Sequence, residues 1–143
     1  MSVQQAKRYF ELMDSPDAGT DDVMELYGDD PTVHSSRAGV VRGRENIREF
    51  YEDNGEFFTG GAHHMEHFHE AGNTVVCEGY LDGETRVGRS AEGVPLCDVM
   101  EFDDDDNIVA FRAYLDYRGF VDEVPEAVPN VQAEANGEAE TDG

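Results

Sequence analysis

Lysine is almost absent from this sequence, which has one, Lys7, and nine arginines against 33 acidic residues. The formal net charge of −23 disfavours binding to nucleic acid and to anionic membranes, because both need clustered basic side chains. So much like charge strains a compact chain in dilute buffer, whereas molar salt shortens the screening length to about 3 Å. The composition therefore predicts a protein suited to very high salt.

Cysteine and long apolar segments are also scarce. Cys77 and Cys97 are too few for a disulfide framework and lie in strand-like segments, so we expect reduced, buried thiols. No apolar run approaches the roughly 18 residues of a membrane span, and the first residues lack the pattern of a signal peptide. These absences predict a cytoplasmic protein.

Cofactor motifs are missing as well. The sequence has no glycine-rich phosphate loop and no Gly-x-Ser-x-Gly elbow. The acidic run 103–107 is followed by Ile108 where a calcium loop needs glycine, so it is typical of a hairpin turn. We expect no cofactor.

The hydrophobic periodicity predicts helices first. Apolar residues recur at helical spacing over 3–14, and a short second helix begins at Thr20 and includes Tyr27. A third helix extends from Arg44 to about Asn54.

The second half of the chain alternates between apolar and polar residues, which is typical of strands. After a short strand at 32–35, the predicted strands are 63–70, 74–87, 94–102 and 108–117. This order predicts an α+β fold, in which a cone-shaped, mixed or antiparallel sheet wraps the three N-terminal helices around an internal pocket. We expect this domain to span 1–123, followed by an acidic, disordered tail over 124–143.

Several segments together resemble one known superfamily. They are Lys7 to Phe10 with Leu26 to Val33, Gly43 to Tyr51, and Asp98 to Phe102 with Ile108 to Asp116. In order and content they resemble the cone domains of ketosteroid isomerases, SnoaL-like polyketide cyclases, limonene epoxide hydrolases and nuclear transport factor 2. The resemblance covers about residues 3–120 and implies the fold, but this fold hosts many unrelated activities.

The resemblance to ketosteroid isomerases implies an oxyanion hole. Tyr9 falls at the position of that family's first-helix tyrosine and Asp98 at the position of its neutral acid. Alternation gives Asp98 the apolar neighbours Leu96 and Met100, and burial among them would favour the neutral carboxyl. The position of the family's base is Ser35, whose hydroxyl cannot take a proton α to a carbonyl without a base of its own.

The last predicted strand carries polar residues at alternate positions. Arg112, Tyr114 and Asp116 share one face, which we expect to point into the cone. Asp116 would act there as a base or water-activating group tuned by Arg112, or the two would form an internal ion pair. The opposite face, with Phe111 and Leu115, predicts an apolar outer stripe that forms a homodimer.

A histidine-rich segment precedes these strands. His63, His67 and His69 share one parity, but a zinc or iron site needs a further ligand, so we expect no metal. This strand face would instead partly line the pocket. The predicted pocket residues are Ser35, Phe50, Met100, Tyr114 and His67.

Two functions remain open at this point. One is an isomerase or lyase acting on a small apolar carbonyl compound, with Tyr9 and Asp98 as oxyanion donors and Asp116 or a pocket histidine as the base. The other is a non-catalytic ligand-binding or dimerisation module of the same fold, in which Tyr9 and Asp98 form a structural pair. The two donor positions favour the enzyme, and Ser35 at the position of the base favours the module.

Overall fold

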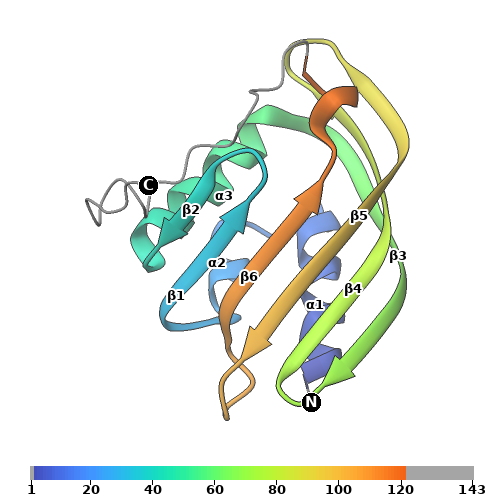
Figure 1. Ribbon diagram of the computed structural model, residues 1–143. Coiled ribbons are helices and arrows are strands. Elements are labelled where there is room, and N and C mark those ends of the chain that lie inside the picture. The colour runs from blue at the N-terminus through green and yellow to red at the C-terminus, as the bar shows by residue number, and fades with distance from the viewer. Residues whose placement is uncertain (1, 122–143) are drawn as a thin grey trace, which may run out of the picture.

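The computed structural model describes residues 2–121 (Figure 1). The tail predicted for 124–143 lies outside the described residues. The helices and strands are, in order, α1 (Ser2–Asp14), α2 (Thr20–Met24), β1 (Tyr27–Ser35), β2 (Gly39–Arg42), α3 (Arg44–Phe57), β3 (Phe58–Ala71), β4 (Thr74–Thr85), β5 (Ser90–Phe102) and β6 (Ile108–Leu115), with a 3-10 turn, η1 (Tyr117–Gly119).

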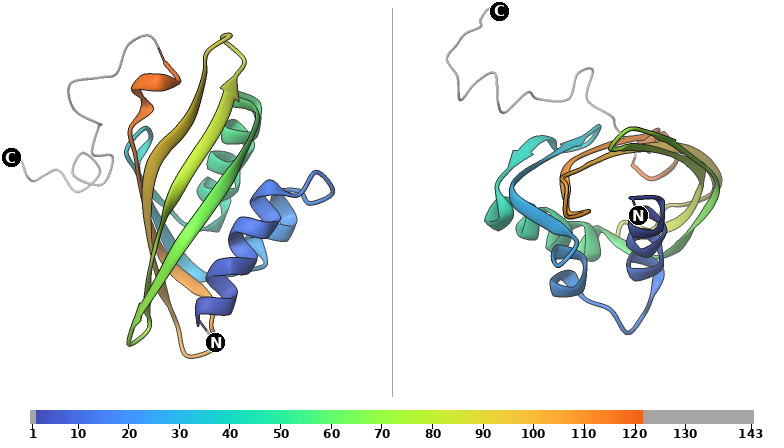
Figure 2. Two further views of the ribbon diagram at one scale, coloured as in Figure 1. Left: turned by 90° about the vertical axis from the view of Figure 1, so that its right-hand side faces the viewer. Right: turned by 90° about the horizontal axis from the view of Figure 1, so that it is seen from below.

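The strands form one mixed sheet in the order β2-β1-β6-β5-β4-β3. β1 pairs with β6 in parallel, and every other neighbouring pair is antiparallel. The sheet curves around α1, α2 and α3, which lie on its concave side (Figure 2). The predicted α+β cone with a curved sheet around three helices is confirmed.

The core lies between the helices and the concave face of the sheet. α1 buries Ala6, Tyr9 and Phe10, whose spacing places them on one side of the helix. α3 buries Ile47 and Tyr51 in the same way. Because each large apolar side chain removed from water contributes about 1.5–3 kcal/mol, these two helix faces attach the helices to the sheet.

The structure differs from the prediction around Tyr27. This residue begins β1 and does not belong to the second helix, which ends at Met24. Pro31 does not mark a helix end but lies within β1, where the pairing with β6 shifts register between Tyr27 and Thr32. Such an irregularity accommodates a proline that cannot donate to the ladder.

The predicted orientation of β6 is wrong. Ile108 and Phe111 are both buried in the core, although their spacing of three residues does not fit strand alternation. The pairing of β5 with β6 is irregular beside Ile108, and this shift reverses the faces of the residues that follow. Arg112 and Tyr114 therefore lie on the convex face, where the Tyr114 side chain is 52% exposed. The apolar outer stripe expected to include Phe111 is not present.

Both cysteines are free thiols. Cys77 is buried, as predicted, and burial raises the pKa of its thiol to about 12. Cys97 is only partly buried on the convex side.

No helix among residues 2–121 is long and apolar enough to cross a membrane.

Candidate functional site

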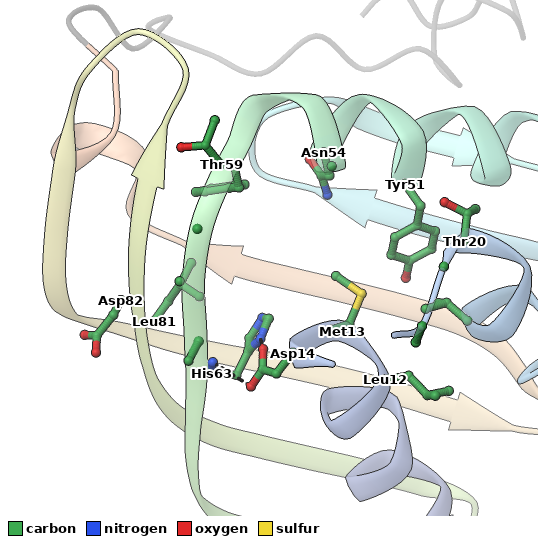
Figure 3. Close-up of a pocket in the computed structure, with 18 residues that line it drawn as sticks. Leu12, Met13, Asp14, Thr20, Tyr51, Asn54, Thr59, His63, Leu81 and Asp82 are labelled. Atoms are coloured by element: carbon green, nitrogen blue, oxygen red, sulfur yellow. Dashed lines mark hydrogen bonds and ion pairs between the residues drawn. The ribbon is translucent and has the colours of Figure 1, made fainter. Parts of the chain in front are cut away.

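A cavity of about 330 Å³ lies between the C-terminal ends of α1 and α3 and the first half of β3 (Figure 3). Small residues leave this space open. Gly55 on α3 has no neighbouring atom within 4 Å of the place a Cβ would take. On β3, Gly61 has φ +140° and passes so close to the backbone of Asp82 that no other residue fits. The lining residues include neither lysine nor arginine, and the Asp82 carboxylate points away from the cavity, toward His64 (Figure 3).

An aspartate–histidine pair forms one wall of the cavity. Asp14, the last residue of α1, holds His63 of β3 through two contacts. Its Oδ1 lies 2.6 Å from the ring Nδ1, and its Oδ2 accepts the backbone N–H at 2.9 Å. Because an ionised carboxylate only accepts, it selects the tautomer with the proton on Nδ1 and leaves the lone pair on Nε2. The pair therefore has the geometry of an oriented general base.

A chain of three tyrosine hydroxyls leads from the cavity wall into the core. The Tyr51 hydroxyl oxygen lies 2.9 Å from that of Tyr9 and 2.6 Å from that of Tyr27. Each of the two hydrogen bonds uses one hydroxyl proton, so the third proton can be donated to another group. Burial raises the pKa of all three hydroxyls, and they stay protonated. Tyr51 alone of the three lines the cavity.

Asp98 lies behind this chain, on the concave face of β5. Burial raises the pKa of its carboxyl to about 8, against the lowering effect of a hydrogen bond from the backbone N–H of Tyr114. The carboxyl is therefore mostly neutral at pH 7, in agreement with the expectation from strand alternation. A negative charge on Asp98 would raise the pKa of Tyr9, but the hydroxyl of Tyr9 contacts that of Tyr51. Neither Tyr9 nor Asp98 is among the residues that line the cavity.

The structure places the two other predicted catalytic residues outside the cone. Asp116 accepts hydrogen bonds from Arg118, which hold the pKa of its carboxyl at about 2. Arg112 pairs with Glu101 at 2.6 Å and not with Asp116. The expectation that Arg112 and Asp116 point into the pocket is wrong, because the faces of β6 are reversed.

The predicted pocket residues do not line this cavity either. Phe50 and Met100 are buried in the core, and Tyr114 lies on the convex face. The Ser35 hydroxyl accepts the backbone N–H groups of residues 37 and 38, both at 3.1 Å, and so stabilises the turn after β1. His67 is exposed opposite Glu78.

The histidines separate onto two faces of β3. The pairing with β4 shifts register between Met65 and His67, so His63 faces the cavity while His67 and His69 face outward. His69 lies 3.1 Å from Glu78 on that outer face. No group of three metal-ligating residues is found among residues 2–121.

Three cavity residues were missed in the sequence: Asp14, Tyr51 and Asn54. Tyr51 follows Phe50 on the third helix and looks like an ordinary apolar-face residue. Asp14 looks like part of a helix end. The sequence offered one signal of this site. Tyr9, Tyr27 and Tyr51 were all predicted on apolar helix faces, and each carries a hydroxyl that needs a partner when it is buried.

Comparison with known proteins identifies the family. The family model described as a SnoaL-like domain matches residues 6–111. The chain belongs to this SnoaL-like family. No curated protein matches the sequence.

Solved structures share the SnoaL-like fold at low sequence identity. An NTF2-like protein of unknown function from Burkholderia pseudomallei has a TM-score of 0.74 at 18% identity, covering 84% of this chain and 97% of that one. A protein described as a SnoaL-like polyketide cyclase, from Shewanella denitrificans, has a TM-score of 0.70 at 18% identity, covering 85% and 94%. A hypothetical protein with a ketosteroid isomerase-like fold from Catenulispora acidiphila, in complex with trimethylamine, has a TM-score of 0.73 at 14% identity, covering 90% and 96%. At these identities the likeness shows the fold.

Proposed function

We propose that the SnoaL-like cavity binds a small neutral carbonyl compound and moves a proton α to the carbonyl, as an isomerase or lyase does. The observation that carries this proposal is that an oriented base, His63, and a hydroxyl donor, Tyr51, line the same cavity. A ligand-binding or isomerase-like role agrees with the family, and the reaction itself is our proposal.

His63 acts as the base. Its Nε2 takes a proton from the α carbon, and the electron pair of that C–H bond forms a carbon–carbon double bond. The carbonyl π electrons move onto oxygen and give an enolate. Asp14 keeps the ring oriented and stabilises the imidazolium that forms. The same nitrogen then returns the proton to a different carbon for isomerisation, or to a leaving group for elimination.

Tyr51 stabilises the enolate oxygen. When Tyr9 and Tyr27 both donate to Tyr51, its own proton is left for the ligand, and the two donated bonds make it a stronger donor. In this arrangement Tyr9 acts through Tyr51, and the neutral Asp98 avoids placing a negative charge beside the chain. A preformed donor of this kind stabilises charge as it develops.

The character of the cavity disfavours an anionic ligand. The Asp14 carboxylate lies in its wall, and the lining residues include neither lysine nor arginine. A carboxylate substrate would lie near the Asp14 carboxylate, with no cation in the wall to balance the two charges. One structural neighbour is in complex with the small molecule trimethylamine, which supports a small occupant for this fold.

Filling the cavity is expected to slow the proposed reaction. In molar KCl and D₂O, the protein should accelerate deuterium exchange at the α carbons of 2-tetralone, followed by NMR. Gly55→Leu should reduce that rate at least tenfold, because Gly55 lines the cavity and its Cβ position is open. The helix should tolerate the change, since glycine costs a helix about 1 kcal/mol relative to alanine.

Glu52→Leu, which adds the same side chain on an exposed part of α3, is the matched control and should exchange at the wild-type rate. Exchange no faster than in buffer would overturn the proposed reaction and leave a non-catalytic binding module. Equal rates for wild type and Gly55→Leu would show that the activity lies outside this cavity.

The convex face supports the predicted homodimer on grounds other than an apolar stripe. Tyr80 and Tyr114, 40% and 52% exposed, both lie on this face. We expect light scattering in molar KCl to give twice the chain mass, and the double substitution of both tyrosines by serine to shift it toward one. A wild-type monomer would contradict the dimer.

The cytoplasmic location and the adaptation to very high salt stay predictions, supported by the free thiols and by the net charge.

A further inference from the structure

Arg37 lies behind the cavity wall, in the turn between β1 and β2. Its guanidinium carbon is 4.7 Å from the ring centre of Phe57 and 5.8 Å from that of Tyr117. Two aromatic faces therefore hold the cation in place. Its Nη2 donates to Oδ1 of Asn54 at 2.5 Å, and its Nε is buried without a hydrogen-bond partner. The two rings and the contact with Asn54 hold the side chain in one position.

This contact fixes the amide of Asn54. A guanidinium has only donors, so the atom of Asn54 that faces Arg37 must be the oxygen, whichever way the amide is drawn. The NH₂ group then points away from Arg37. In Figure 3 the nitrogen of Asn54 points into the cavity, which Asn54 lines. Among residues 2–121 this nitrogen has no hydrogen-bond partner.

We propose that Asn54 is a specificity-determining residue that donates a hydrogen bond to a second, neutral acceptor oxygen of the ligand, such as a ketone, ester or ether oxygen. The inference rests on the proposed function, in which Tyr51 binds the reacting carbonyl. An oriented donor favours a ligand with an acceptor there, because a ligand without one leaves the N–H groups unpaired. The substrate class is therefore a small neutral compound with two separated oxygens.

Arg37 is a positioning residue in this scheme, because it acts on the ligand only through Asn54. Removing its donors lets the amide rotate and turn its oxygen to the cavity. A second acceptor on the ligand would then meet an acceptor on the protein for part of the time. The preference for such a ligand should fall, while the binding of a ligand without the acceptor should not change.

Two rigid phenols test the inference by fluorescence titration in molar KCl. 6-Acetyl-2-naphthol carries an acceptor oxygen at the end of the ring system opposite its hydroxyl, and 6-ethyl-2-naphthol has the same shape without it. The wild type should bind the acetyl compound about tenfold more tightly. Asn54→Leu and Arg37→Met should bring the ratio of the two dissociation constants close to one. Asn46→Leu, on the exposed side of the same helix, should keep the wild-type ratio.

The outcomes separate the two proposals. If wild type binds both phenols equally, or if the ratio survives in Asn54→Leu and Arg37→Met, the role of Asn54 is wrong and the proposed function stands. If wild type binds neither phenol, the cavity assignment fails and this inference fails with it. Should Asn54→Leu not fold, Arg37→Met decides alone, since it leaves the cavity wall unchanged.

Discussion

Replacing His63 by glutamine should slow α-proton exchange in 2-tetralone by about 10²–10⁴-fold, the contribution of a positioned general base. Glutamine keeps a polar group of similar length but has no basic nitrogen. The binding of 2-naphthol, which needs the hydroxyl of Tyr51 and not the base, should change little. Exchange rates by NMR and binding by fluorescence, on the same preparations, separate the two effects.

His64→Gln is the matched control for this experiment. His64 is the next residue on β3, faces outward and lies 2.8 Å from Asp82. We expect its substitution to leave the exchange rate near that of the wild type. A His63→Gln protein that exchanges at the wild-type rate would exclude His63 as the base.

Asp14→Asn should act through the tautomer of His63. An asparagine placed to donate to Nδ1 stabilises the ring with its proton on Nε2, where the lone pair is needed. The rate should fall as for His63→Gln, although His63 is intact. If Asp14→Asn instead raises KM and leaves kcat unchanged, Asp14 only shapes the cavity.

Asp98 should make the stability of the protein fall as the pH rises. Its pKa is raised from 3.8 to about 8, so between these values the folded state keeps a proton that the unfolded chain releases. Over that window the free energy of unfolding should decrease by about 1.4 kcal/mol per pH unit, and it should level off above the folded pKa. Below the unfolded pKa both states are protonated, and the contribution of Asp98 is constant.

Asp98→Asn removes this titration, and its amide oxygen can still accept the backbone N–H of Tyr114. Urea unfolding in molar KCl between about pH 5 and pH 8 should show the variant gaining several kcal/mol on the wild type as the pH rises. Asp116→Asn is the control, because the lowered pKa of Asp116 confines its effect to more acidic solutions. Parallel curves for wild type and Asp98→Asn would contradict the raised pKa.

Periodicity located most elements but not the faces of the strands. α1 and α3 were predictable because their buried residues follow helical spacing without interruption. β2 was missed, since its four residues are too few to establish alternation. β3 begins at Phe58, five residues before its prediction, in a glycine-containing stretch with no alternating pattern.

The candidate site was predicted only in part for the same reason. A register shift after Met65 separates His63 from His67, and another beside Ile108 turns Arg112 outward. Each shift inverts the parity of every later residue on its strand, and alternation alone cannot reveal it. The extra residue of the second shift lies on β6, so alternation holds along this part of β5 and the predicted burial of Asp98 was correct. The contact of Asp14 with His63 joins residues 49 positions apart, which no local pattern encodes.

The parallel pairing of β1 with β6 has a consequence for how this chain folds. β1 lies between β2 and β6, so its longer neighbour is not available until residues 108–115 have been synthesised. Until then, the edge of β1 that pairs with β6 has no partner strand. Non-local pairing of this kind slows folding and prolongs the time in which exposed edges can associate. The many hydrated carboxylates of this acidic chain would limit association between neighbouring copies during that interval.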